Sequence, residues 1–567
     1  MKAAGMATKH GPVTHGKLPL AIVWSRVLHG LPIVASDHIK ARPCATGRMK
    51  GEVMDDAAAA QRARRDTVGD AIGRAADRFR NRIALRFADR AWSYAVLDAE
   101  AARLAAALCA AGLARGDRVV AFGRNSDRYL LCWLACCKAG LIHVPANYAL
   151  SPPELSFIVR QCGARLLLHD AGLASTAQAA GAPAVQSFDT LTPADDPPAE
   201  VGEAVDDGDV AQILYTSGTT GAPKGAMLPH RALLAQYASC IVALDFTEGD
   251  RVLAALPLYH TAQMHALAMP QLMAGAEIFL IESPVPALCL EMIERHRLTS
   301  FFAPPTVWIS LLRHPNFATR DLRMLQKAYY GAAIMPVPVL RELRERLPGI
   351  RAYNAYGQSE IAPVATVLRP EEHDARPTSV GRPVLHVQTR VVDPEGRDVP
   401  PGKRGEIVHR SPQLMLGYWD NPAETARAFE GGWFHSGDVG TFDAEGYLYV
   451  VDRIKDIINT GGVQVASREV EEALFTHPAV SEVAVIAVPD PKWIEAVAAV
   501  VVLRDGAAAT ETELVEHARA RLAPFKLPKQ VFFAESLPKN TAGKLLKREL
   551  RLRYAGTGAA VMGLESA

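Results

Sequence analysis

The chain has 567 residues, of which 49% are hydrophobic and 22% charged, so it is long enough to bury the cores of more than one domain. Its 62 Lys and Arg nearly balance its 61 Asp and Glu, which argues against a nucleic-acid binder, since such a protein would carry a basic footprint. The eight cysteines show no spacing typical of a zinc site or a disulfide framework, so a reducing, cytoplasmic location is expected. Cys132, Cys136 and Cys137 cluster at helical spacing and are interpreted as small core residues.

The N-terminal segment differs in composition from the rest of the chain. Its first fifty residues carry eight Lys or Arg against one acid, Asp37, and residues 1–60 are predicted to form a poorly ordered extension. The apolar stretch 18–35 is interrupted by Arg26, His29 and Pro32, so it is not expected to span a membrane. Peripheral contact with a membrane, from which an apolar substrate could be collected, stays open.

From about Thr67 onward, strand patterns alternate with helix patterns. Residues 67–79 are typical of an amphipathic helix, and Ser93 is expected to cap a long helix that ends at Gly112. Similar units continue to about residue 333, and such alternation predicts parallel sheets in an α/β fold. Between about 380 and 450, turn signals separate alternating apolar runs, as in a small antiparallel sheet.

A charged pentapeptide at 452–456 marks the expected boundary before two further helix and strand patterns. The sequence therefore predicts an α/β protein with a large N-terminal domain of parallel sheets and a small β subdomain, plus a small mobile α+β domain. The predicted segments are an extension at 1–60, the large domain at 61–452, a hinge at 453–456, the small domain at 457–553 and a tail at 554–567.

Residues 214–228, LYTSGTTGAPKGAML, form the most informative stretch. An apolar, β-prone run leads into a loop of Thr, Ser and Gly that ends at Lys224. Inward-facing backbone N–H groups, hydroxyls and an ammonium together suit a polyphosphate. The loop is not a Walker A motif, because no Gly-Lys-Ser/Thr follows at the spacing which that motif needs.

Further motifs carry groups that suit a nucleotide. In the segment 356–360, YGQSE, the aromatic ring can cover a purine, the hydroxyl can reach a phosphate oxygen and Glu360 can hold Mg²⁺. Asp438 in an SGD turn offers a charged acceptor, although Gly-Asp also forms plain Asx turns. Near the C-terminus, Lys544 on a flexible Asn-Thr-Ala-Gly loop could be delivered to an anionic centre and withdrawn again.

These motifs, in this order over residues 65–552, resemble those of the adenylate-forming superfamily of acyl-CoA synthetases, adenylation domains and luciferases. The resemblance implies catalytic roles for Lys544, Glu360, Lys224 and His260, with Mg²⁺ on Glu360, Lys455 as the hinge residue, and Gly461 and Gly462 on the side of CoA. It also implies an ATP site formed by Thr216, Ser217, Gly218, Thr219, Thr220, Gly221, Lys224, Gly331, Ala332, Tyr356, Gly357, Ser359, Asp438, Arg453 and Lys544.

The function that the resemblance implies is an ATP-dependent acid–CoA ligase with ATP, Mg²⁺, CoA and a small carboxylic acid as partners. Residues 257–270 and 300–373 look like bacterial fatty-acyl-CoA synthetases, which favours a medium- or long-chain fatty acid. Its tunnel would be lined by Phe301, Phe302, Trp308 and Met335, unless these are plain core residues.

Other readings of the same motifs stay open. They are an aryl or cyclic acid, transfer to a carrier protein, a luciferase-like oxygenase and a nucleotide-binding pseudoenzyme. The sequence leaves both a monomer and a homodimer open.

Overall fold

The structure is a computed structural model that describes residues 60, 63–195, 205–216, 223–333, 335–541, 543 and 545–554. Nearly all of the predicted N-terminal extension and most of the tail therefore lie outside the described residues. The same holds for positions 217–222 of the phosphate loop and for Lys544.

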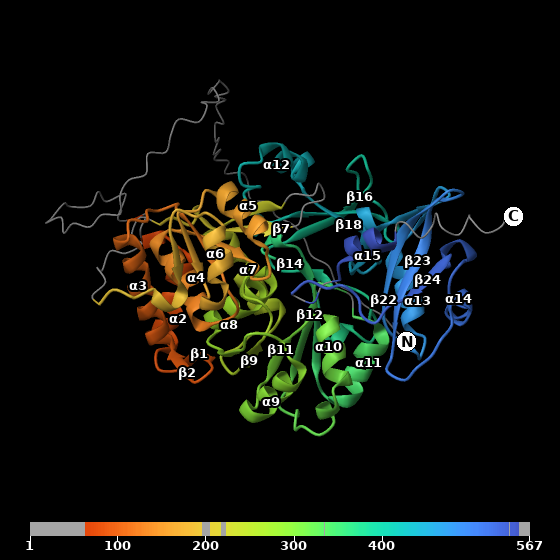
Figure 1. Cartoon of the computed structure of the whole chain (residues 1–567), viewed down its shortest axis with the longest axis horizontal. Helices are drawn as coiled ribbons and strands as arrows, with labels where there is room; N and C mark the ends of the chain where they lie inside the picture. The colour runs from red at the N-terminus through yellow and green to blue at the C-terminus, as the bar shows by residue number, and fades with distance from the viewer. Residues whose placement is uncertain are drawn as a thin grey trace, which may run out of the picture. The chain divides into compact units, whose positions relative to one another are not determined.

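Two mixed sheets with parallel centres form the N-terminal part of the chain (Figure 1). The N-terminal sheet is parallel except where β7 pairs with β8. Its strand order is β6 (Val185–Ser187), β5 (Leu166–His169), β3 (Arg118–Phe122), β4 (Ile142–Ala146), β7 (Val210–Thr216) and β8 (Lys224–Pro229).

The central sheet is parallel in its middle and antiparallel at both edges. Its strand order is β15 (Arg382–Pro383), β14 (Val364–Leu368), β13 (Arg351–Gly357), β12 (Lys327–Gly331), β11 (Ser300–Phe302), β9 (Arg251–Ala254), β10 (Glu277–Leu280), β1 (Ile83–Phe87) and β2 (Arg90–Ser93).

Helices cover these two sheets. One apolar cluster joins α2, α3 and α4 to strands of both sheets, and a second packs α9, α10 and α11 on the central sheet. The helices of this part are α2 (Val68–Phe79), α3 (Tyr94–Ala110), α4 (Asp127–Ala139), α5 (Pro152–Cys162), α6 (Ala174–Ala179), α7 (His230–Ala243), α8 (Met269–Ala274), α9 (Pro286–His296), α10 (Pro305–Arg313), α11 (Val337–Arg346) and α12 (Pro422–Ala428).

The helix starts follow the local signals in the sequence. Thr67 caps α2 through a reciprocal capping box with Asp70, and the Ser93 hydroxyl accepts the amide of Val96 at the start of α3, as predicted. In α4 the cysteines 132, 136 and 137 are fully buried, which confirms their interpretation as small core residues.

Two antiparallel units complete the fold. The predicted small sheet is confirmed in β16 (Gln388–Val392), β17 (Gly405–Arg410), β18 (Phe434–Phe442) and β19 (Leu448–Arg453). The β-rich C-terminal unit contains β20 (Ile458–Thr460), β21 (Val463–Val465), β22 (Val480–Asp490), β23 (Ile494–Leu503) and β24 (Gln530–Phe533), with α13 (Ser467–Phe475), α14 (Glu511–Arg519) and α15 (Lys547–Tyr554). The predicted α/β fold class is therefore confirmed.

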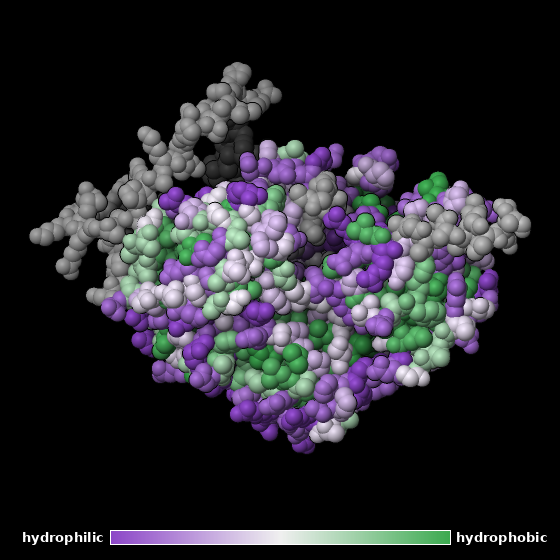
Figure 2. All heavy atoms as spheres, in the orientation of Figure 1, coloured by the Kyte–Doolittle hydropathy of each residue, from purple (hydrophilic) through white to green (hydrophobic). Residues whose placement is uncertain are grey.

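The surface carries both polar and apolar groups. Figure 2 shows hydrophilic residues interspersed with smaller apolar groups, and the exposed large apolar side chains of the C-terminal unit include Trp493, Phe525 and Phe533. None of the helices within the described residues is long and apolar enough to cross a bilayer.

A buried ion pair ties the central sheet together at the start of its strands. The Lys327 ammonium at the start of β12 donates to both oxygens of Asp250, at 2.8 and 2.9 Å, and to the carbonyl of Asp245 at 2.6 Å. The side chains of Lys327 and Asp250 are only 9% and 4% exposed. Two opposite charges held in this way stabilise the native pairing of these strands mainly because neither can be left alone in the interior.

We predict that Lys327→Met lowers the free energy of unfolding by about 3 kcal/mol, because it leaves the Asp250 carboxylate buried without its cation. Urea unfolding would measure the loss. Arg323→Met is the matched control, since Arg323 forms a solvent-exposed pair with Asp321 whose removal should have little effect. Equal stability of the Lys327 variant and the wild type would contradict this account.

Candidate active site

The two ends of the predicted phosphate loop are neighbours across a strand pair. Thr216 ends β7 and pairs with Lys224, the first residue of β8, in antiparallel register. Lys224 therefore begins a strand, and the loop does not open a helix as it would in a Walker motif. The five predicted loop residues Ser217, Gly218, Thr219, Thr220 and Gly221 lie outside the described residues.

The Glu360 carboxylate lies against the end of β7. Its Oε1 accepts the hydroxyl of Thr216 at 3.1 Å and the phenol of Tyr418 at 3.2 Å. Burial, together with the Glu360 charge, raises the pKa of Tyr418 well above its ordinary value, so this phenol stays a donor. Carboxylate and hydroxyl oxygens are ligands that Mg²⁺ accepts alongside phosphate and water, so Glu360 and Thr216 fit that ion.

A second carboxylate, Asp438, collects donors from several motifs. Its Oδ2 accepts the Tyr356 phenol at 2.7 Å and the Gln358 amide at 2.8 Å. Its Oδ1 lies 3.2 Å from Nε of Arg453, which is its cross-strand partner between β18 and β19. Burial and the Asp438 charge raise the pKa of Tyr356. The residues predicted to bind the nucleoside are thus brought into one cluster.

Close backbone packing explains the glycines at the ends of β12 and β13. A Cβ on Gly331 would lie 2.3 Å from the carbonyl oxygen of Ala355, and one on Gly357 would lie 1.8 Å from that of Pro363. Ala332 follows in the left-handed region with φ 63°. These three predicted residues form the backbone at the carboxyl ends of neighbouring strands, where ligands of open α/β sheets bind.

The acid segment, residues 257–261 around the predicted catalytic His260, joins this cluster through one hydroxyl pair. Thr261 Oγ1 lies 3.1 Å from Oγ of Ser359, next to Glu360. His260 is half-buried, with its ring against Tyr259 at 5.4 Å between centroids. The π-helix Ala262–Ala268 follows directly, a rare element that often occurs at functional sites.

The four apolar residues considered for an acyl tunnel are packed in the core. Phe301 and Trp308 are fully buried in edge contact at 5.3 Å, and the indole donates to the carbonyl of Tyr329 at 3.2 Å. Met335 packs in the same cluster, and Phe302 packs in a neighbouring one. The plain-core interpretation therefore describes these side chains better than a tunnel lining.

Lys544 itself lies outside the described residues, but its neighbours contact the large domain. The Tyr259 hydroxyl bonds to that of Thr541, which also lies 3.3 Å from Oδ1 of Asn147. The Thr306 hydroxyl donates to the carbonyl of Gly543 at 3.0 Å. Burial raises the pKa of Tyr259 to about 12, so its proton is retained for this contact. The segment that carries Lys544 is thus held beside the acid segment.

The predicted hinge and thiol residues lie in the two turns that flank β20. Lys455 falls in the short turn Ile454–Asp456 between β19 and β20, and burial lowers its pKa. Gly461 and Gly462 form the two-residue turn between β20 and β21, both with positive φ, as a type I′ hairpin requires. Their roles in hinge motion and CoA binding stay predictions.

Several residues around the site gave no clear signal in the sequence. Tyr418 reaches Glu360, Gln358 reaches Asp438, and Glu424 forms an ion pair with Lys224 from a position 200 residues away. Burial and the Arg427 guanidinium lower the pKa of Lys224, while Glu360 opposes that shift. Of these residues, only Gln358 lies in a motif that the sequence analysis identified, the segment YGQSE at 356–360.

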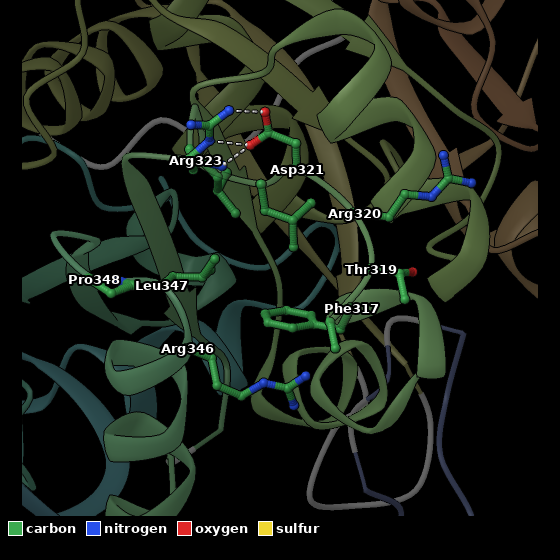
Figure 3. Close-up of a pocket in the computed structure, with 11 residues that line it drawn as sticks. Phe317, Thr319, Arg320, Asp321, Arg323, Arg346, Leu347 and Pro348 are labelled. Carbon is green, nitrogen blue, oxygen red and sulfur yellow. Dashed lines mark hydrogen bonds and ion pairs between the residues drawn. The ribbon is translucent and has the colours of Figure 1, made fainter.

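A separate pocket of about 590 Å³ lies on the large domain between the Pro315–Phe317 turn and the end of α11 (Figure 3). Its guanidinium groups are already used: Arg323 pairs with Asp321, Arg320 with Glu294, and Arg346 lies over the Phe317 ring. It contains none of the predicted site residues, and we assign it no role.

Comparison with known proteins gives matches over most of the chain. Residues 72–419 match the family described as AMP-binding enzyme, and residues 469–544 match its C-terminal domain. A feruloyl-CoA synthase from an Amycolatopsis species is 40% identical over 473 residues, which cover 83% of this chain and 96% of that protein. A long-chain-fatty-acid–CoA ligase from Mycobacterium tuberculosis is 32% identical over 486 residues, or 82% and 93% of the two chains.

Among solved structures, ATP-bound MatB from Rhodopseudomonas palustris matches with a TM-score of 0.79 at 32% identity. The match covers 87% of this chain and 100% of that one.

We predict that Tyr259→Phe loosens the segment at 538–546, because it removes a hydroxyl that holds Thr541. A hydrogen bond contributes about 1 kcal/mol, so amide exchange in this segment should accelerate roughly fivefold. Hydrogen exchange with mass spectrometry would measure the rate. Tyr148→Phe, on the neighbouring ring, is the control that should leave exchange unchanged. Identical rates in both variants would refute the contact.

Proposed function

The chain belongs to the AMP-binding enzyme family and is an ATP-dependent acid–CoA ligase, and from this premise we propose that its acid is an arylpropenoic acid of the ferulate type. The observation that carries the proposal is the 40% identity with a feruloyl-CoA synthase along 96% of that enzyme. The packed state of Phe301, Trp308 and Met335 supports a compact acid over a long chain.

A medium- or long-chain fatty acid is the second candidate. It rests on the resemblance of residues 257–270 to fatty-acyl-CoA synthetases and on the 32% identity with a long-chain-fatty-acid–CoA ligase. Both candidates share the same chemistry at the carboxylate and differ only in what surrounds the remainder of the acid.

In the first step of the proposed reaction, a carboxylate oxygen of the acid attacks the α-phosphorus of ATP. The bond to the bridging oxygen breaks, and pyrophosphate leaves with the electron pair. Lys224 would bind the outgoing phosphates, Tyr356 and Asp438 would hold the nucleoside, and Lys544 would balance the charge that develops at the α-phosphate. A Mg²⁺ ion held by Glu360 would neutralise phosphate charge when bound.

In the second step, the CoA sulfur attacks the carbonyl carbon of the acyl-adenylate after its thiol has lost a proton. AMP leaves with the electron pair of the acyl–oxygen bond. We propose that the C-terminal domain turns about Lys455 between the two steps, which withdraws Lys544 and presents the Gly461–Gly462 turn. One site would thereby serve both reactions.

A panel of acids tests the proposed substrate class. We expect kcat/KM for ferulate and related arylpropenoic acids to exceed that for octanoate and palmitate by at least about a hundredfold, because a site that fits an arylpropenoic acid loses several contacts at once with a straight aliphatic chain. Pyrophosphate release and acyl-CoA formation would be measured together. A higher kcat/KM for palmitate than for ferulate would contradict the arylpropenoic acid and favour the fatty acid as substrate.

The same panel, run with and without CoA, separates the remaining alternatives. Adenylate that accumulates despite CoA would indicate transfer to a carrier protein. A CoA-independent oxidised product would indicate an oxygenase.

The role of Lys544 has its own test. We predict that Lys544→Ala slows pyrophosphate release by about a thousandfold, since it removes the cation at the α-phosphate, yet leaves thiolysis of supplied acyl-adenylate within about threefold. Single-turnover assays of each half-reaction would measure the two rates. Lys403→Ala, on an exposed loop, is the control. Equal loss in both half-reactions would rule out the assignment.

A further inference from the structure

Lys224 is paired with a carboxylate that none of the predicted motifs contains. Its ammonium contacts Oε2 of Glu424, and the two side chains are only 11% and 15% exposed. The ammonium also lies 5.5 Å from the centre of the Tyr418 ring. The lysine predicted to bind phosphate oxygens therefore already forms an ion pair with a carboxylate of the protein.

Glu424 is held in this position independently of Lys224. It lies in the first turn of α12, where the Asn421 side chain accepts its amide at 3.2 Å. Thr425 anchors the same turn, because its hydroxyl accepts the amide of Tyr418 at 2.9 Å and donates to the carbonyl of Asn421. Arg427, one turn on, supplies a second cation for the Glu424 carboxylate.

The segment before α12 is fixed to β8 by an isolated antiparallel bridge between Ala226 and Tyr418 and by the hydrogen bonds around it. Met227 donates to the carbonyl of Gly417 at 3.0 Å, and Leu416 donates back to Met227 at 2.9 Å. Trp419 donates to the carbonyl of Gly225 at 2.7 Å, next to Lys224. Since these bonds already fix the segment that leads into α12, the ion pair with Lys224 is not needed to hold the helix.

We infer that Glu424 is a competing counter-ion, whose carboxylate neutralises Lys224 and so weakens the hold of the site on polyphosphate. This rests on the function proposed above, in which Lys224 binds the outgoing phosphates. A phosphate oxygen that binds the Lys224 ammonium must share it with Glu424 or displace Glu424 from it. The weakening applies to the product pyrophosphate as much as to ATP, and it favours release of pyrophosphate after the first step.

The test measures binding of magnesium pyrophosphate to the full chain by calorimetry. We expect Glu424→Gln, which keeps the shape but removes the charge, to bind pyrophosphate about three- to tenfold more tightly than the wild type. Glu430→Gln is the matched control, because Glu430 is an exposed carboxylate shortly after the same helix, and it should change nothing. Glu424→Ala should tighten binding in the same direction.

A double-variant cycle tells two failures apart. In a Lys224→Met background, Glu424→Gln should alter pyrophosphate binding by less than about twofold, since the two charges act on each other. Unchanged or weaker binding in both Glu424 variants would overturn the inference while leaving Lys224 as a phosphate ligand. If Lys224→Met alone does not weaken pyrophosphate binding, the proposed role of Lys224 fails instead.

Discussion

The site depends on the contact of Glu360 with the end of β7. Glu360 follows β13 of the central sheet, whereas Thr216 ends a strand of the N-terminal sheet, and their hydrogen bond joins the two sheets at their ligand-binding edges. The amide of Met415 donates to the carbonyl of Glu360 at 2.8 Å. Met415 directly precedes the segment that is hydrogen-bonded to β8. Glu360, the two ends of the predicted phosphate loop and α12 are therefore positioned by one continuous set of bonds.

Because backbone hydrogen bonds position these side chains, the fold also sets which charges lie close together in the site. Glu424 pairs with Lys224 and Arg427, and the Glu360 charge also acts on Lys224, so the formal charges of these four side chains cancel. A site with unopposed cations would bind both ATP and pyrophosphate tightly, and uniform tight binding of this kind does not accelerate turnover. In the proposed mechanism, the neutralising carboxylates would allow the phosphates to be held during the reaction and then released.

The sequence predicted those features whose cause is local. The helix at 67–79, the Ser93 cap and the buried cysteines of α4 each follow from a few neighbouring residues. Motif resemblance placed Tyr356, Asp438 and Arg453 together across a long stretch of chain. The partner of Lys224 could not be predicted, because a Glu in the first turn of α12 is what any helix would favour.

Long-range contacts also decide how firmly the C-terminal segment is held. Tyr259 and Thr541 are 282 residues apart, and their contact, with those of Asn147 and Thr306, consists of a few polar bonds. Each such bond contributes about 1 kcal/mol, far less than the apolar clusters inside either domain. The proposed exchange of Lys544 for the Gly461–Gly462 turn needs an interface of this kind. These hydroxyl contacts can be broken and replaced by water at little cost, whereas Phe475 of α13, which packs against the apolar cluster of α9, α10 and α11, would also have to separate from it.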